Sequence, residues 1–184
     1  MTDKHWKVLA SRQLFDRPWL KIRVDQVRTG RGVTIDEYHL IQALDWVCVV
    51  CVTEAQELVL VEQYRHGVGQ VTLELPAGAV DGGETPLQAA QRELREETGY
   101  AAKNWTHLLS VSPETTRHSH RAHLFLATEA ILVGSQQLEQ TEDVAVRLWP
   151  QARDTALITQ LSHGIHVTAW LLAQARLAEV GSAT

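Results

Sequence analysis

The sequence has little cysteine, no long apolar run and no excess of positive charge. Its 184 residues include only Cys48 and Cys51, too few for a disulfide framework, which fits a reducing compartment such as the cytoplasm. No segment approaches the ~18 consecutive apolar residues of a transmembrane helix, so we expect no membrane partner. The stretch MTDKHWKVLA lacks the apolar core of a secretory signal, so we expect none.

Charge and composition narrow the function further. A net charge of −5 argues against a general nucleic-acid binder, which carries a basic surface, so we expect no nucleic-acid partner. A hydrophobic content of 45% and a charged content of 21% are typical of a globular domain. The length suits one domain with a small additional module. A small anionic substrate stays compatible with this charge, because a cation and a few arginines can hold it locally.

The two cysteines form a C-x-x-C pattern that could indicate a redox or zinc site. They lie in DWVCVVCVT, an apolar run that predicts a buried strand. Because side chains alternate along a strand, Cys48 and Cys51 should point to opposite faces. We therefore favour packing over metal or redox chemistry.

The most informative stretch is Gly78–Tyr100, which reads GAVDGGETPLQAAQRELREETGY. A glycine-rich loop leads to Thr85 as helix N-cap, Pro86 at the first helical position and Gln88 as partner in a capping box. Gly99 is a natural helix stop. The sequence therefore predicts a helix between Thr85 and Gly99.

Three acidic side chains share one face of this predicted helix. Glu93, Glu96 and Glu97 are spaced i, i+3 and i+4, and Arg92 is placed to pair with Glu96. The neighbouring face is apolar and should pack on a sheet; it consists of Leu87, Ala90 and Leu94. An exposed acidic helix is one explanation. A site for hard divalent cations, Mg²⁺ or Mn²⁺, explains the clustered carboxylates better, since bound cations neutralise them.

At this point the residues resemble the signature of the Nudix hydrolases. That signature combines a Gly, a Glu, Arg-Glu, an aliphatic residue, Glu-Glu, a Gly and an apolar residue at fixed spacing. Its positions are met here by Gly78, Glu84, Arg92, Glu93, Leu94, Glu96, Glu97, Gly99 and Tyr100. The resemblance implies an α/β fold, the Nudix α/β/α sandwich with a mixed sheet. It also implies cleavage of a nucleoside diphosphate linked to another group.

The segment before the box adds an expected N-terminal antiparallel β extension. We expect strands at Trp6–Leu9, Trp19–Val27 and Thr34–Ile41, the last two forming a hairpin. Residues 1–42 would be a dimerisation region and residues 43–184 the hydrolase domain. This segment resembles the ADP-ribose and nucleotide-sugar branch of the family, in which it builds a homodimer.

Later elements are expected from pattern alone. Strands are predicted at Asp45–Thr53, Leu58–Arg65, Val71–Leu75, Trp105–Val111, His123–Ala127 and Val144–Trp149, and helices at Gln151–Leu157 and Thr168–Glu179. The last helix should bury Trp170, Leu171 and Leu177.

Further site residues follow from the same branch resemblance. It implies that the backbone carbonyl of Ala77 joins Glu93, Glu96 and Glu97 as a metal ligand. Arg65 would contact phosphate, although a surface ion pair is the alternative. Arg92 would orient a metal-binding carboxylate.

In the same branch, a Glu just before the last predicted strand acts as general base or as an extra metal ligand, so the resemblance implies a base in this loop. Glu142 in TEDVAV matches best, with Glu139 as the fallback. Glu96 and Glu97 are the alternatives within the box, because a base needs a carboxylate near the attacking water.

Two further groups could contact substrate. Trp19 and Trp46 could stack on a base, although core packing is common for tryptophan. The loop from Ser112 to Arg121 could place Arg117 on the substrate. His118, His120 and His123 could suggest zinc, but no set of ligands completes a tetrahedral site.

The substrate expected from the resemblance is a nucleoside diphosphate sugar. Pro113 lies closer to Gly99 than the proline of ADP-ribose-type members, so ADP-ribose and sugars such as GDP-mannose both stay open. The alternatives are other nucleoside diphosphate derivatives, namely dinucleoside polyphosphates, nucleoside triphosphates or capped RNA. A ligand-sensing module without catalysis is a further alternative, which the intact acidic positions disfavour.

Overall fold

The computed structural model describes residues 4–18 and 20–181, and the chain divides into two compact units. The N-terminal unit comprises Met1–Leu44 and Ser112–Arg121. The main unit comprises Asp45–Val111 and Ala122–Thr184. Each unit is described by itself.

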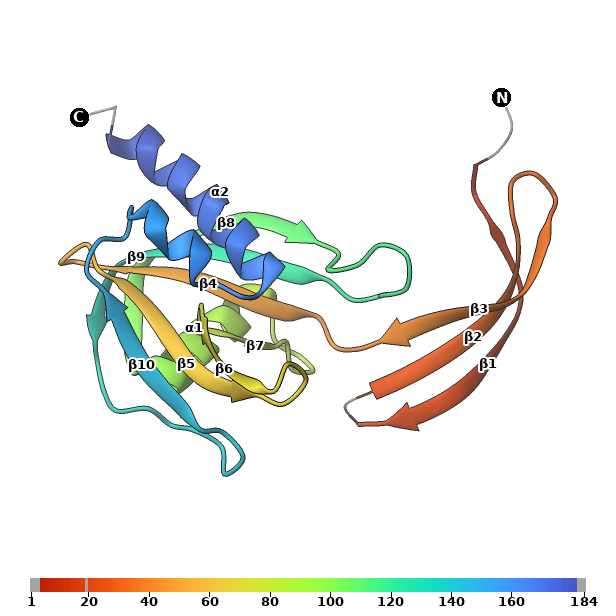
Figure 1. Ribbon diagram of the computed structural model, residues 1–184, viewed down its shortest axis with the longest axis horizontal. Helices are drawn as coiled ribbons and strands as arrows, with labels where there is room; N and C mark the ends of the chain where they lie inside the picture. Colours follow the sequence, from red (N-terminus) through yellow and green to blue (C-terminus); the bar gives the residue numbers. More distant parts are fainter. Residues whose placement is uncertain (1–3, 19, 182–184) are drawn as a thin grey trace. The chain divides into compact units, whose positions relative to one another are not determined.

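The N-terminal unit is built on an antiparallel sheet with strand order β1-β2-β3 (Figure 1). The strands are β1 (Lys7–Arg17), β2 (Leu20–Arg28) and β3 (Thr34–Gln42). The predicted hairpin of the second and third strands is confirmed. The first strand was predicted too short, because it continues to Arg17 and the turn is confined to Pro18 among the described residues.

The segment 112–121 belongs to this unit because its backbone bonds to β3. The N–H of Ile41 donates to the carbonyl of Arg117 at 2.8 Å, and the N–H of Ser119 donates to the carbonyl of Ile41 at 3.1 Å. The hydroxyl of Tyr38 also donates to the carbonyl of Thr116. This loop is therefore held by residues that lie far from it in the sequence.

The main unit is organised around a mixed sheet with the order β10-β5-β4-β9-β8 (Figure 1). Its strands are β4 (Trp46–Thr53), β5 (Leu58–Arg65), β6 (Gln70–Glu74), β7 (Ala77–Ala79), β8 (Tyr100–Val111), β9 (Ala122–Leu132) and β10 (Val144–Trp149). Strand β6 pairs with β5, and β7 pairs with β4. The β4–β9 pair is parallel and the other pairs are antiparallel. The predicted mixed sheet is confirmed.

Two helices cover opposite faces of this sheet, as Figure 1 shows. Helix α1 (Pro86–Thr98) agrees with the prediction, and α2 (Gly164–Gly181) begins earlier than the predicted Thr168. The helix predicted at Gln151–Leu157 is wrong. The chain forms only a short 3₁₀ turn there, η1 (Thr155–Thr159), capped by Asp154.

Strand β4 separates two apolar clusters because its side chains alternate between the faces. Cys48 packs in the cluster under α2, and Cys51 packs in the cluster under α1. Both thiols are free and buried, and burial raises the pKa of Cys51 to about 12. The packing interpretation of the cysteines is confirmed.

Two predicted core residues are on the wrong side of their helices. Leu87 is 39% exposed, and Ala89 takes its place beside Ala90 and Leu94. Leu171 is 48% exposed, whereas Trp170 is fully buried. Among the described residues, no helix combines the length and the apolar character needed to cross a bilayer.

Candidate functional site

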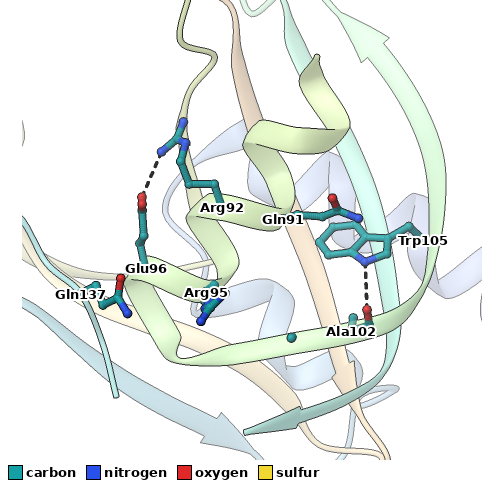
Figure 2. Close-up of a pocket in the computed structure, with 8 residues that line it drawn as sticks. Gln91, Arg92, Arg95, Glu96, Ala102, Trp105 and Gln137 are labelled. Carbon is teal, nitrogen blue, oxygen red and sulfur yellow. Dashed lines mark hydrogen bonds and ion pairs between the residues drawn. The ribbon is translucent and has the colours of Figure 1, made fainter. Parts of the chain in front are cut away.

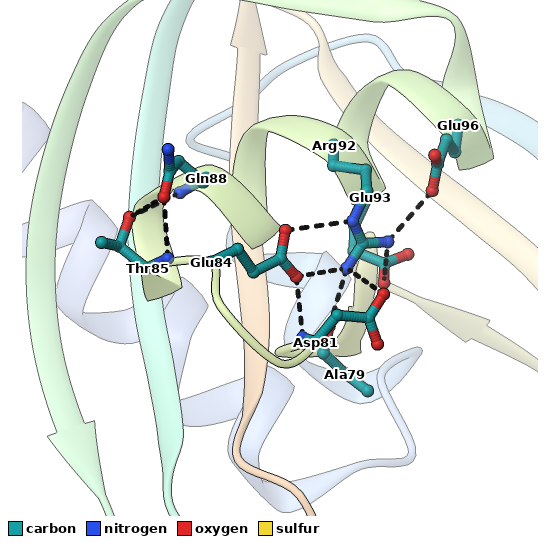
Figure 3. Close-up of polar contacts among 8 residues, drawn as sticks. All are labelled: Ala79, Asp81, Glu84, Thr85, Gln88, Arg92, Glu93 and Glu96. Atoms are coloured by element: carbon teal, nitrogen blue, oxygen red, sulfur yellow. Dashed lines mark hydrogen bonds and ion pairs between the residues drawn. The ribbon is translucent and has the colours of Figure 1, made fainter.

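The start of helix α1 is fixed by its capping residues (Figure 3). The N–H of Gln88 donates to the hydroxyl oxygen of Thr85 at 3.3 Å, and the N–H of Thr85 donates to the amide oxygen of Gln88 at 2.8 Å. Gly99 ends the helix with φ 75°, and its N–H donates to the carbonyl of Arg95 at 2.8 Å. The acidic face between these caps is therefore held in one register.

Gly78 makes room for one of the acidic side chains. A Cβ built at Gly78 would overlap the carboxylate of Glu93. No side chain other than hydrogen fits here while Glu93 keeps its position, so the glycine allows the carboxylate to lie against the β7 backbone.

Arg92 is the centre of the polar network in Figure 3. Its guanidinium donates to Glu84 at 2.7 Å, to Glu93 at 2.8 Å and to Glu96 at 3.0 Å. It also donates to the carbonyl of Ala79 at 2.9 Å. Arg92 therefore holds more than the predicted Glu96, and it links the glycine-rich loop to the acidic face of α1.

One arginine does not balance the charge of this face. Glu93 and Glu97 are buried, and burial raises the pKa of both carboxyls. The nearby carboxylate of Glu142 raises the pKa of each, and Glu93 adds to the effect on Glu97, whose pKa reaches about 8. Clustered buried acids of this kind gain stability when a cation neutralises them.

The acidic face suits a divalent cation by its chemistry. Carboxylate oxygens are the protein ligands that hard divalent ions prefer. Among the described residues, no three His, Cys, Asp or Glu side chains converge as a ready-made metal site. The reason is visible in the contacts: Arg92 bridges Glu93 and Glu96, while Glu97 accepts the N–H of Ala77 at 3.0 Å. Metal ligation by Ala77, Glu93, Glu96 and Glu97 stays a prediction.

The loop that carries Glu142 is tied to the end of α1. The N–H of Gln137 donates to the carbonyl of Glu96 at 2.8 Å, and the side chain of Gln136 donates to the carbonyl of Glu97 at 2.6 Å. Glu142 is exposed and accepts the N–H of Glu139 at 2.8 Å. The predicted base therefore lies close enough to the box to affect Glu93 and Glu97, and its role stays a prediction.

A cavity of ≈ 570 Å³ lies between α1 and the first residues of β8 (Figure 2). Arg92, Glu96, Arg95 and Gln137 line it, together with the indole of Trp105. The indole N–H is already used, since it donates to the carbonyl of Ala102 at 3.2 Å. Arg92 and Glu96 of the acidic box thus border this cavity.

A second cavity, of ≈ 550 Å³, adjoins the residues before the box, and we call it the α2 cavity. Its lining includes Trp46, Arg65, Glu74, Ala77, Gly78, His163 and His166. Arg65 forms two bonds to Glu74, at 2.9 and 2.6 Å. Both interpretations of Arg65 therefore meet here: it forms an ion pair and it lines a cavity next to the predicted metal ligand Ala77.

His163 and His166 are residues that the sequence analysis did not single out. They flank the start of α2, and their ring centroids lie 4.6 Å apart with the ring planes tilted by 30°. The ring centroid of Trp46 lies 5.4 Å from that of His163 and 6.0 Å from that of His166. The only sequence signal was His163-Gly164 at the helix start, and nothing local linked it to strands over a hundred positions earlier.

The remaining predicted residues are Arg117, Trp19 and the histidine group. Arg117 lies in the N-terminal unit, and its substrate role stays a prediction. Trp19 lies outside the described residues. Of the predicted histidine group, His123 lies in the main unit and bonds to Ser110 at 2.7 Å and to Asp45 at 3.1 Å. His118 and His120 stack in the N-terminal unit.

Two family models match the chain. Residues 44–171 match the NUDIX domain, and residues 6–41 match the nucleoside diphosphate sugar hydrolase N-terminal domain. The first match covers most of the main unit and contains the whole acidic box.

Known proteins resemble the chain over most of its length. It is 30% identical to the ADP-ribose pyrophosphatase of Bacillus subtilis, over 76% of both chains. It is 31% identical to the ADP-ribose pyrophosphatase of Mycobacterium tuberculosis, over 83% of this chain and 74% of the relative. Its fold is similar to the crystal structure of an ADP compounds hydrolase, with a TM-score of 0.83, 21% identity and 96% of each chain covered.

Proposed function

The chain belongs to the Nudix hydrolase family, and on that premise we propose that it hydrolyses the diphosphate of nucleoside diphosphate sugars. The products would be a nucleoside monophosphate and a sugar phosphate. ADP-ribose is the leading substrate, since relatives across most of the chain are ADP-ribose pyrophosphatases, and other nucleotide sugars such as GDP-mannose follow.

One observation carries the proposal: an intact acidic box follows a segment that matches the N-terminal domain of nucleoside diphosphate sugar hydrolases. The box supplies diphosphate chemistry. The N-terminal match points to the sugar compounds among the many substrates that contain a diphosphate.

Nudix hydrolases use divalent metal ions, and we propose Mg²⁺, with Mn²⁺ as a substitute, held by Glu93, Glu96 and Glu97 with the carbonyl of Ala77. A bound ion would neutralise the diphosphate and lower the pKa of the attacking water. Arg92 orients the box carboxylates through its bonds to Glu93 and Glu96.

The remaining steps fall to side chains outside the box helix. Arg65 has Nη1 without a partner among the described residues, and we assign it to a phosphate oxygen. Glu142 takes the proton of the attacking water, because it is the carboxylate outside the helix whose charge reaches Glu93 and Glu97.

The assembly is proposed to be a homodimer. Strand β1 is exposed along its whole length in the chain by itself, and it presents apolar side chains such as Val8, Leu14 and Phe15. A small sheet of this kind is stabilised by packing on another surface. Light scattering on the full chain should give twice the mass of one chain, and a monomer would refute the dimer. The buried free thiols suit a reducing compartment, so we place the protein in the cytoplasm.

A substrate screen tests the function. The protein would be incubated with MgCl₂ and ADP-ribose, GDP-mannose, UDP-glucose, diadenosine polyphosphates or nucleoside triphosphates, and the products separated by ion-exchange chromatography. We expect AMP and ribose 5-phosphate from ADP-ribose, and no turnover with excess EDTA. Turnover of triphosphates or dinucleotides alone would move the enzyme to another substrate class of the family. No turnover of any compound would favour a ligand-sensing role.

A further inference from the structure

The two histidines of the α2 cavity present their protons in the same way. Nδ1 of His166 accepts the N–H of Leu75 at 3.2 Å, and Nδ1 of His163 accepts the N–H of Ile165 at 3.2 Å. A neutral imidazole that accepts at Nδ1 carries its proton on Nε2. Each ring is therefore fixed as an Nε2–H donor by a backbone bond.

No acceptor for either Nε2–H lies among the residues that the structure describes. His166 is only 2% exposed, and it still lines the cavity together with His163. Both donors keep access to the cavity: His163 is exposed, and Nε2 of His166 is not fully enclosed, so each can bond to water or to a partner there. Here the space for that partner is the cavity itself.

Charge in the α2 cavity is balanced. Arg65 and Glu74 neutralise each other, and Glu74 also accepts the hydroxyl of Thr72 at 2.6 Å, so its acceptor sites are largely used. Apart from Nη1 of Arg65, which is assigned above to phosphate, the cavity offers neutral donors and the aromatic wall of Trp46. A base edge presents donors as well as acceptors, whereas each sugar hydroxyl can accept a hydrogen bond and turn its own proton to water.

We propose that the α2 cavity is the subsite for the sugar of the substrate, with the Nε2–H groups of His163 and His166 donating to its hydroxyls. This inference rests on the proposed function. The cavity also reaches Ala77 and Gly78, where the predicted metal site and the diphosphate would lie, so a sugar linked to that diphosphate enters it directly. A volume of ≈ 550 Å³ accommodates a pentose or a hexose. Trp46 would then form a wall of the sugar subsite and would not stack on a base.

The test compares two substrates that differ only in the sugar: ADP-ribose, and the methyl ester of the ADP β-phosphate. His166→Asn keeps the acceptor for Leu75, because an Asn oxygen can take the place of Nδ1, but it removes the donor at the Nε2 position. We expect the ratio of kcat/KM for ADP-ribose to kcat/KM for the methyl ester to fall about tenfold. His166→Gln, which can place an N–H near the Nε2 position, should restore part of that ratio.

His163→Asn gives a second route if the buried position does not tolerate substitution. His163 is exposed and caps α2, and the Asn oxygen preserves the cap while the donor is lost. We expect the same change of ratio, about threefold. His107→Asn, at an exposed histidine outside the cavity, is the matched control and should leave the ratio unchanged.

The outcomes separate the two proposals. If the wild-type protein hydrolyses neither ADP-ribose nor any other nucleotide sugar, the proposed function fails and the sugar subsite with it. If the wild type is active and the ratio stays constant in folded His166→Asn and His163→Asn, the subsite alone is refuted. A selective loss for the methyl ester would also refute it, since that result would assign the cavity to the diphosphate end.

Discussion

The box and the α2 cavity both contain a buried glutamate beside an arginine, but they handle charge differently. At the box, Arg92 serves three glutamates, and Glu93 and Glu97 still have raised pKa values. In the α2 cavity, Arg65 serves Glu74 alone, and the adjacent histidines are neutral donors. The unbalanced region calls for a cation, and the balanced region suits an uncharged group.

We expect the largest effect on activity from the removal of one buried acid from the box, which tests whether this region needs a cation. Glu97→Gln keeps the size of the side chain and an oxygen for the N–H of Ala77. We expect kcat to fall about 100-fold or more, because a predicted metal ligand is lost. The melting temperature of the metal-free protein should hold or rise, since the amide in Glu97→Gln would not have to be kept neutral next to Glu93 and Glu142 as the carboxyl of Glu97 is. Steady-state kinetics and thermal unfolding measure the two effects, and near-normal kcat would refute the metal assignment.

A smaller loss is expected when the position of Glu93 is disturbed. Gly78→Ala would overlap its carboxylate and force it away from Arg92. We expect kcat/KM to fall about tenfold, with weaker activation in a MgCl₂ titration.

Gly82→Ala in the same loop is the control for that variant. A Cβ at Gly82 meets nothing within 4 Å, so activity should stay within about twofold of wild type. Equal effects of the two variants would show that loop flexibility, and not the space for Glu93, matters.

In the α2 cavity, Arg65→Met tests whether the ion pair with Glu74 stabilises the folded protein. Glu74 is 3% exposed, and without Arg65 its carboxylate is left buried with only the Thr72 hydroxyl. We expect unfolding free energy to fall by about 1–3 kcal/mol, less than for a fully buried pair because Arg65 is half-exposed. Urea denaturation measures it. Arg147→Met breaks an exposed pair with Glu62 and should cost under about 1 kcal/mol.

The smallest effect concerns pH. Burial, together with the neighbouring His163, lowers the pKa of His166 from 6.5 to about 3. Below pH 6.5 the unfolded chain takes up this proton and the folded chain does not, so stability from His166 is present above 6.5 and is lost as pH falls toward 3. Between about pH 6 and pH 5 the wild type should lose about 1 kcal/mol more than His166→Asn. Denaturation curves at the two pH values measure this difference. Equal losses of unfolding free energy in the wild type and in His166→Asn would refute the buried neutral state of His166.

Local signals predicted α1 and its caps because Thr85, Pro86, Gln88 and Gly99 act within one or two helical turns. The same signals could not place Leu87 on the exposed side, since apolar spacing allows two neighbouring faces and the sheet chooses between them. Most strands were predicted with approximate ends, but β7 was missed because Gly78 and Ala79 were assigned to the glycine-rich loop, and β8 and β9 extend beyond their predicted bounds.

The α2 cavity was out of reach for the sequence analysis because it is assembled by tertiary contacts. Trp46 lies near the start of the main unit in the sequence and His166 lies near its end. The hydrogen bond from Leu75 to His166 links residues 91 positions apart. The metal ligands were suggested by their spacing in one helix, whereas the aromatic contact between Trp46 of β4 and His166 of α2 has no local sequence pattern. Residues that act together within one helix were therefore easier to predict from the sequence than residues that separate elements bring together.

Gln136 and Gln137 fasten the start of the loop before β10 to the end of α1. Gln136 donates to the carbonyls of both Glu97 and Val144, so it fastens the helix end to the start of the strand. Residues 138–143, which include Glu139 and Glu142, form the rest of this loop. Insertions or deletions there would shift the reach of its carboxylates without altering the box helix. Protein engineers could therefore change the activity of the hydrolase by exchanging residues 138–143 between relatives.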